Sequence, residues 1–208
     1  MIAKSKSDFR ERFHQDVKNR FVNDVNDHVV QQLHRDGDVV KLWRCGKPES
    51  SVYMFCVCSA PNCLIVYGDM GECMWQRHYD MIPFVRGSAE SLSYFSEKVP
   101  ADLHDSILEY KSELAMEWFE GIREEWIECG GEWGDEHEIA LQDCQDAFDD
   151  DRDSFRNLEN AIADSIFYSD CDDMPNLRWY THHYLWIVEG LKWFVEKLDA
   201  NEVEGFGP

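Results

Sequence analysis

The sequence predicts an α+β fold, in which an N-terminal helix and an antiparallel meander of three or four strands precede a mainly helical, acidic C-terminal half. Three observations predict this fold. Apolar residues recur at steps of four near the N-terminus, the spacing becomes strand-like over residues 39–75, and helical spacing returns after residue 100. The 208 residues are enough for a substantial core. We expect residues 1–100 and 101–208 to pack on each other as a single domain.

The first element is predicted to be one amphipathic helix over residues 8–34. Its apolar stripe repeats every four residues, at Phe9, Phe13, Val17, Phe21, Val25 and Val29. The pair Asp36-Gly37 is a typical end for such a helix. We expect this helix to cover one face of the sheet that follows.

The strands are predicted from four short apolar runs between residues 39 and 76, VVKLWRC, SVYMFCVCS, CLIVYGD and ECMWQ. Turn residues separate them, at 46–48, 61–62 and 68–71. In the last of these turns glycine supplies a positive φ and Asp69 is expected to bond the local backbone. The pattern therefore predicts an antiparallel meander.

Four further helices are predicted, over residues 102–129, 136–148, 154–167 and 178–198. Gly130-Gly131 ends the first of them. The last is apolar on nearly every side, which is typical of a helix at the centre of a fold or in a subunit interface. With the apolar stripe of the first helix, this makes a homodimer an open expectation.

The net charge of −22 is unevenly distributed along the chain. Residues 1–100 hold 13 basic and 13 acidic side chains, whereas residues 101–173 hold 4 basic and 24 acidic ones, or −20. Such a charge argues against direct contact with nucleic acid or an anionic membrane and favours basic proteins as partners. The N-terminus has no apolar signal segment, so we expect a cytoplasmic protein.

The candidate partner-binding residues are carboxylates. In the predicted helix 102–129 six glutamates follow one another at steps of three or four, which places them on one side about 6 Å apart. Duplex DNA carries one charge per ~1.7 Å, so a phosphate-like surface would need further carboxylates nearby. A solvated face is the alternative interpretation. The candidate set is Glu109, Glu113, Glu117, Glu120, Glu124, Glu128, Asp143, Asp146, Asp149, Asp150, Asp151 and Asp153.

Other residues with chemical potential are weaker candidates. Cys56, Cys58, Cys63 and Cys73 lack the CxxC spacing of a zinc knuckle, so we expect buried, reduced thiols. Asp69 and His78 could serve a small enzyme, but no motif for nucleotide binding, acyl transfer or zinc hydrolysis accompanies them. We expect no catalytic residues, no metal and no cofactor.

Three segments resemble blocks of a family of phage and prophage proteins of unassigned function. They are CLIVYGDMGECMWQR, YFSEKVPADLHDSILEYKSELAMEWFEGIRE and THHYLWIVEGLKWFVEKLD. The family pattern is a strand–GDMG–strand hairpin, a Glu-Tyr-Ser-rich helix and a C-terminal helix similar to HYLW. Here Lys111 interrupts the Glu-Tyr-Ser sequence, and the first 36 residues lie outside the resemblance. The resemblance implies phage origin and action in the cytoplasm of a host bacterium.

Together these observations predict a phage anti-defence protein of the anti-CRISPR or anti-restriction type. Its carboxylates would bind the basic nucleic-acid-binding surface of a host effector and act as a DNA mimic. One alternative is a protein-binding adaptor whose acidity serves solubility. Another is a small enzyme that uses the sheet region near Asp69 and His78.

Overall fold

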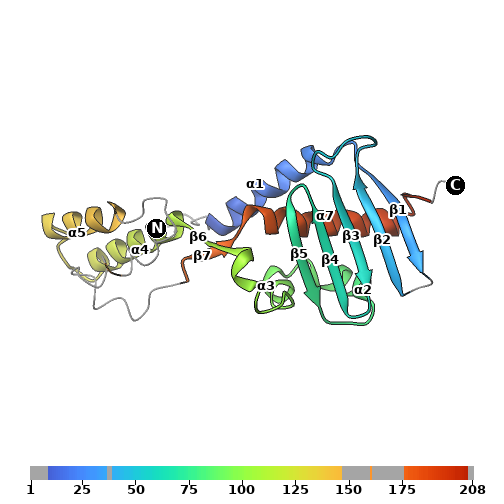
Figure 1. Cartoon of the computed structure of the whole chain (residues 1–208). Helices are drawn as coiled ribbons and strands as arrows, with labels where there is room; N and C mark the ends of the chain where they lie inside the picture. The colour runs from blue at the N-terminus through green and yellow to red at the C-terminus, as the bar shows by residue number, and fades with distance from the viewer. Residues whose placement is uncertain (1–8, 37–38, 147–159, 161–175, 206–208) are drawn as a thin grey trace. The chain divides into compact units, whose positions relative to one another are not determined.

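The computed structural model describes residues 9–36, 39–146, 160 and 176–205 (Figure 1). The chain forms two compact units, one of Met1–Leu108 with Tyr180–Pro208 and the other of Glu109–Trp179. The second unit is therefore an insertion within the first. These bounds differ from a division at residue 100, because the C-terminal helix belongs to the same unit as the N-terminal sheet.

The first unit contains a six-stranded sheet in the order β5-β4-β3-β2-β1-β8. Five consecutive strands form the predicted antiparallel meander, and the sixth, β8, runs parallel to β1. The meander is thus one strand longer than the longest version expected. Its strands are β1 (Val29–Asp36), β2 (Val40–Gly46), β3 (Phe55–Ala60), β4 (Cys63–Gly68) and β5 (Gly71–Gln76), followed much later by β8 (Val203–Glu204).

The extra strand comes from residues that were predicted to be helical. Helix α1 (Phe9–Asp24) ends ten residues before the predicted end, and β1 follows it. The helix prediction for residues 25–34 was wrong for a simple reason. A step of four is also a multiple of two, so residues spaced by four lie on one side of a strand as well as of a helix. Residues 29–36 form a strand because they pair with β2, and Val30 is fully buried in that strand.

The core lies between the sheet and helix α7 (His182–Asp199), which runs across the strands on one face (Figure 1). Aromatic contacts join α7 to three strands. The ring centroids are 5.1 Å apart for Trp43 and Phe194, 5.6 Å for Phe55 and Trp186, and 6.2 Å for Trp75 and Tyr184. The C-terminal helix therefore covers the sheet, in the place expected for the N-terminal one.

Helix α1 packs against α7, where the Phe21 ring meets Trp186 at 5.1 Å. Phe9, Val17 and Phe21 of α1 are thus buried inside the chain, as is most of the apolar surface of α7, whereas Val22 of α1 is 60% exposed. Two short helices, α2 (Met81–Ser88) and α3 (Leu92–Ser96), add Phe84 and Phe95 to the core. In the described ranges, no helix combines the length and the apolar composition needed to cross a lipid bilayer.

The second unit contains the helices α4 (Ser112–Glu128) and α5 (Asp135–Asp146). α4 starts ten residues later than predicted, because His104–Ile107 form a 3₁₀ turn and β6 (Leu108–Tyr110) pairs with β7 (Arg178–Tyr180). β7 in turn occupies the predicted start of the C-terminal helix. α5 agrees with the predicted helix 136–148, and the predicted helix 154–167 lies outside the described residues.

Candidate functional site

Five of the predicted glutamates form one stripe along α4. At 100° per residue, Glu113, Glu117, Glu120, Glu124 and Glu128 fall within a sector of about 80° and extend over about 22 Å of helix. Glu117 is half-buried and the other four are exposed. Leu114, Ala115 and Phe119 are buried elsewhere on the helix circumference. The carboxylate stripe therefore faces solvent over the length of the helix.

The other predicted site residues lie elsewhere. Glu109 is on β6, before the helix begins, and forms an ion pair with Lys111 at 2.6 Å. Asp143 and Asp146 are exposed on α5, where their spacing of three places them on one side. Residues Asp149, Asp150, Asp151 and Asp153 lie outside the described residues. The structure thus assembles five of the twelve candidates into one stripe and adds a second acidic helix in the same unit.

The inserted unit carries most of the formal charge. Its 71 residues contain 22 acidic and 5 basic side chains, a net charge of −17, and the first unit accounts for the remaining −5. Arg123, one of the few basic residues, pairs with Glu138 at 3.2 Å between α4 and α5. This pair and the contact between the Trp126 and His137 rings, at 5.0 Å, join the two helices.

Tyr110 shows the effect of this environment on a neighbouring group. Burial, assisted by the negative charge of Glu113, raises the pKa of Tyr110 to about 12. The phenol is at the start of the carboxylate stripe, one residue before the lysine that pairs with Glu109. It therefore stays neutral across the physiological pH range.

The sequence interpretation missed apolar side chains among the carboxylates. Ile127 is 52% exposed and lies beside Glu120 on the helix circumference, and Ile139 on α5 is 61% exposed between Asp135 and Asp143. The helical angle of each residue would have revealed them. Trp126 of α4 is 44% exposed as well. The acidic surface therefore also carries isolated, exposed apolar side chains.

Asp69 forms a turn, as predicted, although its partners are less local than expected. It lies in the two-residue loop between β4 and β5, where its carboxylate accepts a hydrogen bond from the Tyr53 amide at 2.8 Å. Its own amide donates to the Met54 carbonyl at 2.9 Å. His78 lies past the other end of β5, about 17 Å of strand away. The two residues suggested for an enzyme are therefore at opposite ends of the hairpin.

The cysteines are divided between the two faces of the sheet. Cys56 and Cys58 are on one face of β3, opposite Tyr67 and Ile65 of β4, whereas Cys73 pairs with Val66 on the other face. Burial raises the pKa of the Cys73 thiol to about 12. Among the residues that the structure describes, no three His, Cys, Asp or Glu side chains are placed to hold a metal ion.

No family model, curated protein or solved structure matches this chain. The case for a function therefore depends on the geometry and charge of the described residues.

Proposed function

We propose that this chain is a phage anti-defence protein whose inserted unit binds a basic, nucleic-acid-binding surface of a host effector. The observation that carries the proposal is the carboxylate stripe of α4, with four exposed glutamates on one side of a helix in a unit of net charge −17. Like charges at this spacing repel one another, and a row of lysines and arginines on a partner would offset that repulsion. The phage origin comes from the sequence resemblance.

The stripe by itself is more dilute than a nucleic acid. Its charges are about 6 Å apart along the axis, against ~1.7 Å in duplex DNA, so one helix supplies about a third of the charge density. Asp135, Asp143 and Asp146 on α5 supply further exposed carboxylates in the same unit. Ile127 and Ile139 would add apolar contacts that phosphates lack. The proposal is therefore partial mimicry, in which charge steers association and apolar contacts slow dissociation.

The test is inhibition of purified nucleic-acid-targeting enzymes. A panel of restriction endonucleases and CRISPR effectors is assayed for binding of a labelled DNA duplex, with and without the full chain, at increasing salt. For an inhibited enzyme, the experiment is repeated with Glu113, Glu120, Glu124 and Glu128 all changed to Gln. We expect inhibition to weaken by about tenfold or more, because each lost ion pair is worth several tenths of a kcal/mol or more at a protein interface.

A matched control removes four exposed carboxylates from the other unit, by changing Glu11 and Glu204 to Gln and Asp16 and Asp102 to Asn. This control loses the same charge and should keep inhibition within about twofold. Equal loss of inhibition in both variants would show that only net charge matters, and would contradict binding through α4. Full inhibition by the α4 variant would favour an adaptor that binds through apolar side chains.

A further inference from the structure

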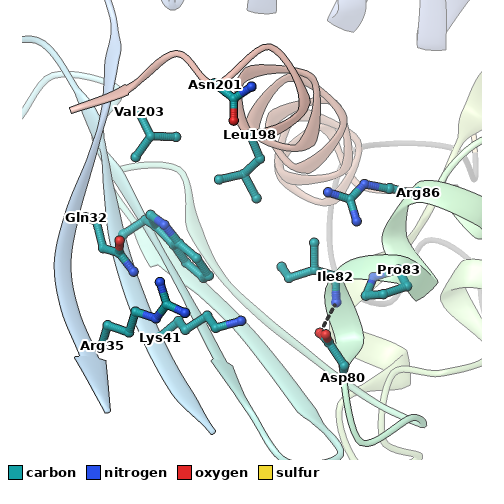
Figure 2. A pocket seen from close by; sticks show the side chains of 11 residues that line it. Gln32, Arg35, Lys41, Asp80, Ile82, Pro83, Arg86, Leu198, Asn201 and Val203 are labelled. Atoms are coloured by element: carbon teal, nitrogen blue, oxygen red, sulfur yellow. Dashed lines mark hydrogen bonds between the residues drawn. The ribbon is translucent and has the colours of Figure 1, made fainter. Parts of the chain in front are cut away.

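Cavities lie toward both edges of the sheet in the first unit. One, of about 550 Å³, lies where α2 and the end of α7 face the strands β1 and β2 (Figure 2). There Arg86 donates to Asp199, at 3.0 Å from Nε to Oδ1, and the Asp80 carboxylate accepts a hydrogen bond from the Ile82 amide at 3.1 Å. These polar groups therefore have partners inside the chain. The main-chain groups of the edge strand β5, at the other end of the sheet, differ in this respect.

The main chain of β5 points alternately toward β4 and away from it. The Arg77 amide, just after the strand, donates to the loop that precedes β4 at 3.3 Å. The Gln76 amide points the other way and donates to the Lys98 carbonyl at 2.9 Å. In an antiparallel pair this alternation repeats every two residues. The amide and carbonyl groups of Glu72 and Met74 therefore point away from β4, as those of Gln76 do.

These four outward groups are available to another strand. Among the residues that the structure describes, no main-chain partner bonds to the amides or carbonyls of Glu72 and Met74. The start of the strand is also open, because a Cβ added at Gly71 would have no atom within 4 Å. Edge strands are commonly protected by proline, by several charges or by a covering segment. β5 has no proline and one charged residue, so its edge can pair with an extended chain.

A cavity of about 520 Å³ adjoins this edge, within the range of about 300–1,000 Å³ typical of ligand sites. Its apolar lining comes from Ile65, Met74 and Leu103. The two hydroxyl groups in its wall are occupied, since Ser106 donates to the Leu103 carbonyl at 2.6 Å and Thr181 accepts a hydrogen bond from the Tyr184 amide at 3.1 Å. All the lining residues belong to the first unit. The cavity therefore favours an apolar side chain.

The register of β5 determines which side chains of an added strand lie on the cavity side. Residues directly opposite Met74 and Glu72 would point to the same face as these two, about 7 Å apart along the added strand. This is also the face of Ile65, which pairs with Met74. An apolar residue opposite Met74 would enter the cavity. A lysine or arginine opposite the exposed Glu72 would form a cross-strand pair of opposite charge.

We propose that β5 binds an extended segment of a partner protein as an added antiparallel strand, through an apolar residue followed two positions later by lysine or arginine. The order follows from the antiparallel direction, in which the residue opposite Met74 precedes the one opposite Glu72. A second copy of this chain fits less well, because two chains of charge −22 repel and β5 contains no basic residue. This site is independent of the proposed function of the inserted unit.

The experiment is fluorescence anisotropy of two labelled peptides titrated with the full chain. TTTLTKTTT carries the proposed order and TTTKTLTTT has the same composition in reverse. We expect the first to bind below about 1 mM and the second about fivefold more weakly or worse. Failure of TTTLTKTTT to bind at about 1 mM overturns the proposal, and equal binding of the two peptides overturns the antiparallel order.

Methylation of single peptide nitrogens tests the main-chain hydrogen bonds. The leucine amide should face β5, whereas the amide of the threonine that follows it should point away. An N-methyl group on the leucine should therefore weaken binding by about tenfold or more, and one on that threonine by less than about threefold. Equal losses from the two methyl groups overturn strand addition.

Substitutions in β5 test the same contacts from the protein side. Met74→Pro removes an outward amide, which an edge strand tolerates, and should weaken binding of TTTLTKTTT by about tenfold, whereas Met74→Leu keeps the amide and should stay within about twofold. The unfolding midpoint of each variant separates a folding defect from a binding defect. Equal binding by the two variants overturns the site. A dimer of the unliganded chain that Met74→Pro abolishes would identify a second copy as the occupant and overturn the assignment to a partner protein.

The ion pair has its own test, which does not depend on proline. Glu72→Lys should weaken TTTLTKTTT by about threefold or more and should bind TTTLTETTT better than the unaltered chain does. The matched control is Glu11→Lys, which makes the same charge change at an exposed position of α1 in the same unit. Equal effects of the two substitutions would mean a general charge effect and would overturn the pairing with Glu72.

Discussion

Trp186 of α7 contacts both α1 and the sheet, and Trp186→Phe is expected to destabilise the first unit by about 3 kcal/mol. Its ring is fully buried against Phe21 and Phe55, with centroids 5.1 and 5.6 Å away. Phenylalanine lacks two ring carbons and the nitrogen of the indole, and the two carbon groups at ~0.8 kcal/mol each account for about 1.6 kcal/mol. The indole nitrogen also donates to the Asp24 carboxylate at 3.0 Å, a charged hydrogen bond worth about 1.5 kcal/mol.

The measurement is urea unfolding followed by circular dichroism, for Trp186→Phe, Asp24→Ala and the double variant. The hydrogen-bond contribution should appear as a coupling energy of about 1.5 kcal/mol between the two substitutions. A total loss below about 1 kcal/mol in Trp186→Phe would refute the reasoning, since it would mean that the ring is not packed as described. A coupling energy near zero would refute the hydrogen bond alone.

The remaining predictions concern the turn after β4 and the stability of the first unit in acid. Gly68→Ala should destabilise the protein by more than about 2 kcal/mol, because an added Cβ would collide with the Met54 carbonyl oxygen. Gly121→Ala, in open space within α4, should instead stabilise it by about 0.5–1 kcal/mol. Thermal unfolding measures both effects, and similar effects of the two substitutions would contradict the close approach at Gly68. Burial lowers the pKa of His28, so the unfolded chain takes up this proton first and stability should fall as pH drops below 6.5. Burial acts to raise the pKa of Glu189, but hydrogen bonds from His14 and Lys192 outweigh it and the pKa is lowered, so a second loss should begin below pH 4.5. Chemical unfolding at a series of pH values should show the upper loss disappear in His28→Asn and the lower one shrink in Glu189→Gln; unchanged profiles would contradict both assignments.

The parts of the fold that depend on nearby residues could be predicted from the sequence. The turn at 68–71 was correct because its geometry requires particular residues at particular places, and Gly71 has the positive φ of +99° that the turn needs. The stripe of glutamates on α4 was correct for the same reason, since helical spacing alone determines which side chains share a side. Glu109 was misplaced because the helix start depends on pairing with β7, about 70 residues away.

The parts that depend on distant pairing could not be predicted. Residues 29–36 form a strand because they pair with β2, and the face of the sheet is covered by α7. The periodicity of a sequence identifies neither the partner of a strand nor the helix that packs on a sheet. The register shift that sets Arg35 opposite Lys41 was missed for the same reason, because a predicted helix over 8–34 leaves no strand in which the register can shift. The exposure of Ile127 could have been predicted, because its angle on the helix is close to that of Glu120.

The position of α7 also affects the order in which the protein can fold during synthesis. About 100 residues separate the end of β5 from the start of the helix that covers the sheet, which at 5–20 residues per second is a delay of about 5–20 s. During that interval Trp43, Phe55 and Trp75 have no α7 to pack against, and β1 lacks its partner β8. The growing chain therefore passes through a stage with an exposed aromatic sheet face, which makes it a substrate for chaperones that bind nascent chains and a risk for aggregation when it is overproduced.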